Sequence, residues 1–277
     1  MGGFFFASNF AFSCDAACAS TIDAPSTSRI CEAAMKIRIA YLEEPPFGWS
    51  GPNGAAMGAD IDLATVVLRA IGATEIEHRL TTFSELLDGV ATGRWDMNVP
   101  LFITPERAQQ VAFSVPVWAM ADGFLVRTDN DKALDSYASV AERRDARLGI
   151  IAGQVQHESA RAAGVSEDQI VVYQQQAEAI EAVRAGTVDA YASTALGNRI
   201  LAERIGGSVL RAVEHRPVTG SALEIPFGAF SFSKNSNDLR HAVNRELRSY
   251  LGSAAHREQM ARFGFTHKEI DPVLSVG

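Results

Sequence analysis

Hydrophobic residues in the first half of the chain alternate between strand and helix spacing. The segment KIRIAYL (36–42) is alternating and then continuously apolar, which is typical of a strand buried in a sheet. Ile61, Leu68 and Ile71 fall on one helical face, and the glycine after them ends that pattern. These patterns predict strands at 36–42, 76–81 and 95–103, helices at 58–71 and 83–91, and a short helix opening at Pro105. This order indicates an α/β fold with a parallel or mixed sheet.

The second half of the chain repeats the alternation after a long extended stretch at 111–127. Polar residues at 129–132 separate the two halves. The repeat predicts helices at 136–143, 155–163, 177–185 and 195–205, and strands at 147–152, 170–174, 189–193 and 209–215. One more strand is expected at 227–233, and two helices at 237–251 and 256–263 then close the chain without strands of their own.

Two α/β units joined by extended segments near 124–128 and 223–230 predict a molecule with two lobes. Because the closing helices lack a core of their own, we expect the chain to return and pack them on the first lobe. The expected first lobe is 35–126 with 226–277, and the second is 127–225. Small ligands of such folds bind in the cleft between the lobes, at the carboxyl ends of the strands.

The segment 1–34 differs in composition from the remainder of the chain. Its apolar stretch at 2–12 is short, no Lys or Arg precedes Arg29, and 17–19 (ACA) can serve as a cleavage site. Two interpretations stay open. An imperfect export signal would make the protein periplasmic, whereas an extension upstream of a translation start at Met35 would leave it cytoplasmic. In both cases we expect disorder up to about Arg29.

The overall composition excludes several classes of function. The 277 residues are 47% hydrophobic and 21% charged, which is typical of a globular protein. A net charge of -8 without a basic cluster disfavours nucleic-acid binding. All three cysteines precede Met35, and the six histidines are scattered without metal-ligand spacing. No phosphate-binding or dinucleotide-binding motif occurs, so we expect neither a metal nor a cofactor.

Three motifs occur in a specific order: GRWD (93–96), FITPER (102–107) and VAFSVP (111–116). In these residues the chain resembles the family 3 extracellular solute-binding proteins, the amino-acid receptors of ABC importers. The motifs EPPF (44–47), GADIDLA (58–64) and GTVDA (186–190) agree with that resemblance. It extends over roughly 36–265 and implies the two-lobed type II periplasmic-binding-protein fold, closing on a ligand. It also implies a monomer that delivers its solute to an ABC permease in the inner membrane.

Within this family, EPPF and the LF-x-x-PER pattern most resemble the branch that binds ectoine and hydroxyectoine. The resemblance implies that Arg107 holds the ligand carboxylate, since a guanidinium fork matches a carboxylate with two parallel hydrogen bonds. Phe47, Phe83 and Phe102 all follow or end a predicted strand, and they are expected to line the cleft. Aromatic faces attract a cation held over them.

Two further residues of the first lobe are candidates. Glu44 can pair with a ligand cation opposite Arg107, although an exposed carboxylate is an equally good interpretation. Pro100 has no N–H but keeps a carbonyl that can accept from a ligand nitrogen. Trp95 and Trp118 are interpreted as structural, and Trp49 as a possible neighbour of the cleft mouth.

The second lobe departs from the pattern of the resembled family. The turn GQVQ (153–156) replaces a turn rich in hydroxyl groups. Gly153 is expected to let backbone N–H groups meet an anion, and Gln154 to replace the hydroxyl that Val155 lacks. Thr194 stands where receptors for α-amino acids usually carry an aspartate for the ammonium group. These departures favour a carboxylate ligand whose cation is delocalised, cyclic or alkylated.

The resulting functional hypothesis is a receptor without enzymatic activity that captures a small zwitterion, either amino-acid-like or ectoine- or betaine-like. The alternative is a periplasmic lyase resembling cyclohexadienyl dehydratase, which has the same fold. That chemistry needs a positioned acid or base, for which Glu44 is the obvious candidate.

Overall fold

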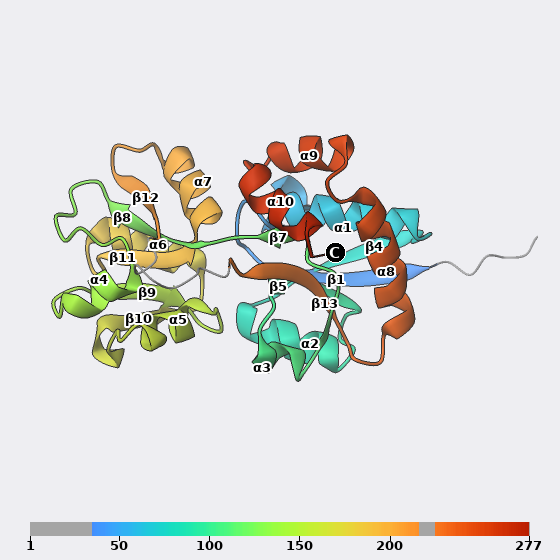
Figure 1. Cartoon of the computed structure of the whole chain (residues 1–277), viewed down its shortest axis with the longest axis horizontal. Helices are drawn as coiled ribbons and strands as arrows, with labels where there is room; N and C mark the ends of the chain where they lie inside the picture. Colours follow the sequence, from blue (N-terminus) through green and yellow to red (C-terminus); the bar gives the residue numbers. More distant parts are fainter. Residues whose placement is uncertain (1–34, 216–224, 277) are drawn as a thin grey trace, which may run out of the picture. The chain divides into compact units, whose positions relative to one another are not determined.

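The structure, a computed structural model, describes residues 35–215 and 225–276. The expectations for 1–34 lie outside these ranges. The described chain forms two mixed β-sheets with covering helices (Figure 1). The first sheet has the order β4-β1-β5-β13-β6, with β7 also paired to β13. Its strands are β1 (Lys36–Tyr41), β4 (Glu75–Leu80), β5 (Met97–Phe102), β6 (Ala112–Phe113), β7 (Trp118–Ala119) and β13 (Phe227–Phe232).

Strand β1 pairs in parallel with both β4 and β5, whereas β13 runs antiparallel to β5. The carboxyl ends of β1, β4 and β5 therefore meet at one edge of the sheet. Helices of this part of the chain are α1 (Ala59–Ala70), α2 (Leu86–Ala91), α3 (Pro105–Ala108), α8 (Asn237–Tyr250), α9 (Ala254–Ala261) and α10 (His267–Leu274). Short 3-10 turns η1 (Pro52–Gly54) and η2 (Phe83–Glu85) and a small hairpin of β2 (Trp49–Ser50) and β3 (Ala56–Met57) complete it.

The second sheet has the order β10-β9-β11-β8-β12. Its strands are β8 (Asp122–Arg127), β9 (Leu148–Ile151), β10 (Ile170–Tyr173), β11 (Ala190–Thr194) and β12 (Leu210–Glu214). Strands β9, β10 and β11 are parallel, and β8 is antiparallel to β11. The accompanying helices are α4 (Tyr137–Glu142), α5 (Gln156–Ala162), α6 (Gln176–Ala185), α7 (Ala195–Ile205) and the 3-10 turn η3 (Glu167–Gln169).

One hydrophobic core joins the first sheet to the closing helices. Ile39 of β1 and Leu63 of α1 are fully buried in the same cluster as Leu247 of α8 and Met260 of α9. The chain therefore returns to its first sheet after the strands of the second, because β13 pairs with β5. The predicted strands and helices between 36 and 263 appear within a few residues of the expected positions.

The expectation that two helices close the chain is wrong, because α10 follows α9. A capping box between Thr266 and Glu269 starts this helix, which contains Pro272. Burial of Ile270 and Val273 then holds it. The stretch 124–128 was expected to be a connection between the lobes. In the structure most of it belongs to β8, a strand of the second sheet.

Candidate functional site

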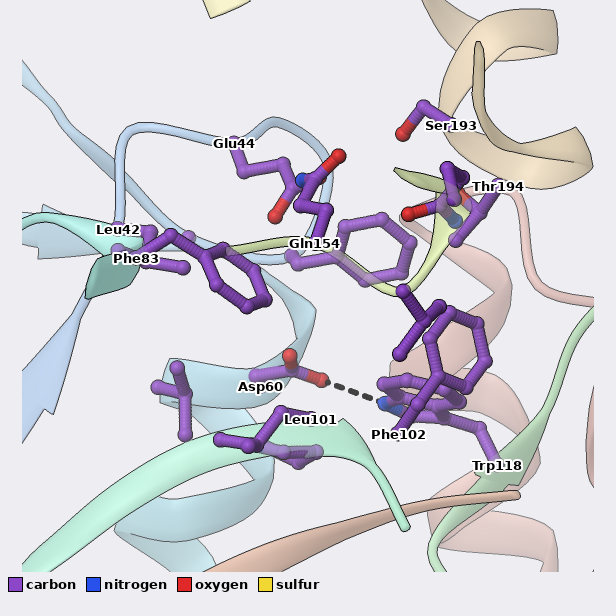
Figure 2. Close-up of a pocket in the computed structure, with 16 residues that line it drawn as sticks. Leu42, Glu44, Asp60, Phe83, Leu101, Phe102, Trp118, Gln154, Ser193 and Thr194 are labelled. Carbon is purple, nitrogen blue, oxygen red and sulfur yellow. Dashed lines mark hydrogen bonds between the residues drawn. The ribbon is translucent and has the colours of Figure 1, made fainter. Parts of the chain in front are cut away.

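A small cavity lies at the carboxyl ends of strands from both sheets, with a volume of about 40 Å³. This volume is enough for a few water molecules. Figure 2 shows its side chains converging from the loop after β1, from the ends of β5 and β11, and from the turn after β9. We call it the aromatic cavity. It is lined by Leu42, Glu44, Phe47, Gly48, Asp60, Phe83, Val99, Pro100, Leu101, Phe102, Trp118, Gln154, Val155, Gln156, Ser193 and Thr194.

The loop after β1 is held against the start of α1. The N–H groups of Ala59 and Asp60 donate to the carbonyls of Pro46 and Phe47, at 2.9 and 3.0 Å. Gly58 makes this approach possible, because its φ is 134° and a Cβ there would lie 2.2 Å from the Phe47 carbonyl oxygen. The motifs EPPF and GADIDLA thus bring Phe47 and Asp60 to one wall of the cavity.

Aromatic rings form a continuous packed wall. The Trp118 indole lies edge-on to Phe102, with ring centroids 5.2 Å apart, and is tilted against Phe47 at 6.0 Å. Phe83 completes the set from the other side of the cavity (Figure 2). The wall is therefore apolar with exposed ring faces, a surface that accommodates a cation or an apolar body.

Two carboxylates face the aromatic cavity. Asp60 is 1% exposed, and its Oδ1 accepts from Trp118 Nε1 at 3.2 Å (Figure 2). Glu44 Oε1 accepts from Gln154 Nε2 at 3.0 Å. Part of the Glu44 residue is open to solvent, but its carboxyl group is enclosed. Burial raises the pKa of Glu44 to about 7, against the lowering effect of hydrogen bonds from Gln154 and Ser193. Burial also raises the pKa of Asp60 well above its usual range, and the nearby Glu44 adds to that rise.

Arg107 lies beside the aromatic cavity rather than on its surface. It is 7% exposed, with its guanidinium 5.4 Å from the Phe83 ring centroid. One terminal nitrogen donates to the Phe102 carbonyl at 2.9 Å, and the other donates to the Gly153 carbonyl at 3.0 Å. A guanidinium has five N–H donors, so three remain. Burial lowers the pKa of Arg107 to about 10, which still leaves it charged at neutral pH.

The turn after β9 contributes lining residues from the second sheet to the site. Gly153 has a φ of 82°, which favours glycine, and its carbonyl faces Arg107. The Gln154 amide points at Glu44, not at an anion site as the sequence had suggested, and its own Oε1 is buried without a hydrogen-bond partner among the described residues. Gln156 donates to Asp122 Oδ1 at 2.8 Å, which anchors the turn to the first residue of β8.

Hydroxyl groups at the end of β11 complete the cavity. Thr194 caps α7, with its Oγ1 accepting from the Gly197 N–H at 3.1 Å. Ser193 lies beside it and is 2% exposed. Pro100 is buried within β5. Among the described residues, no group of three or more His, Cys, Asp or Glu side chains is placed to hold a metal ion.

The structure brings most of the predicted site residues to one cavity. These are Glu44, Phe47, Phe83, Pro100, Phe102, Gln154, Val155 and Thr194, while Arg107 and Gly153 adjoin it through their hydrogen bond. Sequence reasoning missed Asp60, Ser193 and Gln156 as lining residues. It also interpreted Trp118 as structural, although the indole lines the cavity. Trp49 packs on Phe263 and Arg204, outside this lining.

The family model for bacterial extracellular solute-binding proteins, family 3, matches residues 37–263, and the chain belongs to this family. A relative from Sinorhizobium fredii named "Probable amino-acid ABC transporter periplasmic-binding protein" is 32% identical over 237 residues, which are 84% of this chain and 78% of the relative. In the part of the chain that the structure describes, no helix is long and apolar enough to cross a membrane.

Solved structures agree with this two-lobed type II periplasmic-binding-protein fold. The crystal structure of EhuB in complex with hydroxyectoine superposes with a TM-score of 0.76 at 25% identity, covering 87% of this chain and 95% of that one. The ancestral amino-acid-binding protein AncCDT-1, described as a precursor of cyclohexadienyl dehydratase, gives 0.71 at 22% identity, covering 82% of this chain and 95% of that one. The second likeness concerns the fold alone.

Proposed function

We propose that the protein captures a small zwitterionic carboxylate at the aromatic cavity, whose volume of about 40 Å³ has to widen to admit it. The observation that carries this proposal is a buried guanidinium and two buried carboxyl groups beside one small apolar space. Arg107 is buried, its guanidinium donates to two backbone carbonyls, and the carboxylate that interacts with it is that of the exposed Glu106. The carboxyl groups of Glu44 and Asp60 are also buried, and neither has a cationic partner among the described residues. Buried charges without partners are costly, so a ligand with a carboxylate and a cation would satisfy both.

The carboxylate is assigned to the free N–H donors of Arg107. The cation is assigned to the space between the aromatic rings, Glu44 and Asp60. Two acidic groups thus supply the countercharge that Thr194 cannot, so the absence of an aspartate at that position does not leave a cation uncompensated. Cation attraction to each ring adds about 0.5–2 kcal/mol.

The unpartnered Oε1 of Gln154 favours a cation that carries N–H groups. A cyclic amidinium of the ectoine type offers such donors together with a delocalised charge, whereas the trimethylammonium group of a betaine offers none. The likeness to EhuB, whose structure holds hydroxyectoine, supports the same choice. We therefore rank ectoine-like zwitterions above betaines and above proteinogenic amino acids.

Delivery of the solute to an ABC permease in the inner membrane is the cellular role that the family implies. The protein would act as a periplasmic monomer. Residues 1–34 are then the export signal, and a cytoplasmic form starting at Met35 is the alternative.

Competition calorimetry tests the proposal. Ectoine, hydroxyectoine, glycine betaine and the twenty amino acids are titrated into the protein near pH 8, where Glu44 is ionised. Tightest binding by an ectoine supports the assignment. If histidine, glutamine, arginine or another amino acid displaces every ectoine and betaine, the ranking is wrong, and Glu44 with Asp60 serves an ordinary ammonium or side-chain cation.

One observation favours the alternative of a dehydratase-type lyase. The Glu44 carboxyl is enclosed and has a pKa of about 7, which suits a general acid near neutral pH. Incubation with cyclohexadienyl carboxylic acids, followed by the rise of aromatic absorbance, separates the two functions. Turnover that disappears in Glu44→Gln would establish the enzyme, and binding without turnover leaves the receptor.

A further inference from the structure

A second and larger hollow adjoins the aromatic cavity. It has a volume of about 620 Å³, compared with about 40 Å³ for the cavity itself. The two share Leu42, Glu44, Phe83 and Gln154 as lining residues. Figure 2 shows Leu42 and Phe83 on the side of the cavity away from Ser193 and Thr194. We call this second hollow the groove. Two of the shared residues, Glu44 and Gln154, are hydrogen-bonded to each other at this boundary.

The groove has apolar walls and neutral polar groups. Leu80, Ile151 and Ile180 contribute aliphatic surface, and the glutamines at 174–176 contribute amides. Leu80 is 52% exposed, so part of the apolar surface of the groove is uncovered. An arm with methylene groups and hydrogen-bonding ends would cover this surface and find amide partners.

The charges of the groove are of one sign. Glu43, Glu44 and Glu85 line it, and no Lys or Arg is among its described lining residues. Glu85 is partly compensated by Arg94, whose nearest nitrogen is 3.8 Å away. The first turn of α6 would ordinarily attract an anion, but Glu178 already accepts from the N–H groups of Gln174 and Gln175 at 3.1 Å. An acidic arm is therefore disfavoured in the groove.

We infer that the groove is a second subsite, which accepts an uncharged or cationic arm extending from the cation of a zwitterion held in the aromatic cavity. This inference rests on the proposed function, because the head of the ligand occupies that site. The arm can pass from the aromatic cavity into the groove because Glu44 and Phe83 line both. The acidic side chains of the groove favour an arm that is uncharged or cationic. The ligands of the protein then include solutes longer than a single small ring.

A matched series of probes tests the subsite. The parent is 4-guanidinobutyrate, which has a carboxylate and an N–H-bearing delocalised cation. Its derivatives carry a propyl, a 3-aminopropyl or a 2-carboxyethyl group on the terminal nitrogen. We expect the propyl and aminopropyl derivatives to bind about tenfold tighter than the parent, because burial of methylene groups outweighs the lost rotamer freedom. The carboxyethyl derivative should bind about tenfold more weakly than the propyl one, because its charge faces like charges.

Two substitutions on α6 localise the effect. Ala177 lines the groove and is exposed, so Ala177→Phe fills the subsite without touching the aromatic cavity. It should remove the gain from the arm and leave the affinity for the parent within about twofold. Ala185→Phe, at the exposed end of the same helix, is the control and should keep the gain. Gln174→Lys should reverse the order of the aminopropyl and carboxyethyl derivatives.

The outcomes separate the two proposals. If the parent binds and every arm weakens binding, or if the gain survives in Ala177→Phe, the subsite is overturned and the proposed function stands. If neither the parent nor ectoine binds, the proposed zwitterion site fails, and the subsite fails with it. If ectoine binds but the parent and all its derivatives do not, the subsite alone is overturned.

Discussion

The amide of Gln154 donates to the carboxylate of Glu44 at 3.0 Å, joining the turn after the second sheet's β9 to the loop after the first sheet's β1. The Arg107 guanidinium makes a parallel connection to the carbonyl of Gly153. Residues expected only to contact a ligand thus also contact each other across the site.

Arg107→Ala should weaken binding of a carboxylate ligand by about 2–5 kcal/mol, because a buried charge-assisted contact is lost. Isothermal calorimetry measures the loss. Arg211→Ala, which removes an exposed arginine from β12, is the control and should bind as the wild type does. Equal affinities for the two variants would remove Arg107 from the site.

Binding of the zwitterion should depend on pH through Glu44. Its pKa is about 7 in the empty site, and the ligand cation favours the ionised form. Affinity should therefore fall roughly tenfold between about pH 7.5 and pH 6, with proton release on binding in that interval. Burial also raises the pKa of Asp60, so protonation of this second carboxylate at lower pH should weaken binding as well. Glu44→Gln should bind more weakly at pH 8 and show a flatter profile, while the exposed neighbour variant Glu43→Gln should keep the wild-type profile.

The empty protein should become less stable as pH rises from about 4.5 to 7. The folded state holds the proton of Glu44 more tightly than the unfolded chain does, so the stabilising contribution is complete below the unfolded pKa and is lost through the folded one. Thermal melts of wild type and Glu44→Gln across this interval measure the effect. A wild-type melting temperature that rises over the same interval, relative to that of Glu44→Gln, would contradict it.

Phe102→Leu should weaken binding by about 1 kcal/mol, because the ring face is lost while most of the side-chain volume is kept. Phe47→Leu should behave similarly. Phe263→Leu alters a ring that packs on Trp49 outside the cavity lining, and it should leave affinity unchanged. A similar loss for all three would indicate a general effect on packing.

A chain beginning at Met35 should fold and bind like the full chain. Strand β1 begins at Lys36 and the family match begins at residue 37, so the described core starts there. Melting temperatures of the two forms provide the measurement, and a drop of more than a few degrees would show that 1–34 contributes to stability.

Most of the fold follows from hydrophobic periodicity, because each strand and helix buries one recognisable face. The exceptions have physical causes. The helix α10 contains Pro272, which local propensity disfavours, and its stability comes from burial of Ile270 and Val273 against the rest of the chain. Strand β8 reads as an extended connection because its pairing partners, β11 and β12, lie more than sixty residues further along.

The site was only partly predictable. Phe47, Phe83 and Phe102 follow strand ends, where cleft residues are expected. Asp60 looks like an ordinary acidic residue in the first turn of a helix, and Trp118 like a residue of a buried strand. Asp60 and Trp118 are hydrogen-bonded to each other although they are 58 residues apart. Gly58 lets the loop after β1 pack against the start of the helix that carries Asp60, and β7, which carries Trp118, is held in the first sheet by pairing with β13. Such long-range juxtapositions have no local signature in one sequence.

The anchoring of the ligand-facing turn to Asp122 has a mechanical consequence. Gln156 and the Tyr137 hydroxyl both donate to the Asp122 carboxylate, at 2.8 and 2.7 Å, and Asp122 begins the strand that enters the second sheet. We therefore expect the ligand-facing turn, β8 and α4 to move together when a solute contacts Gln154 or Val155.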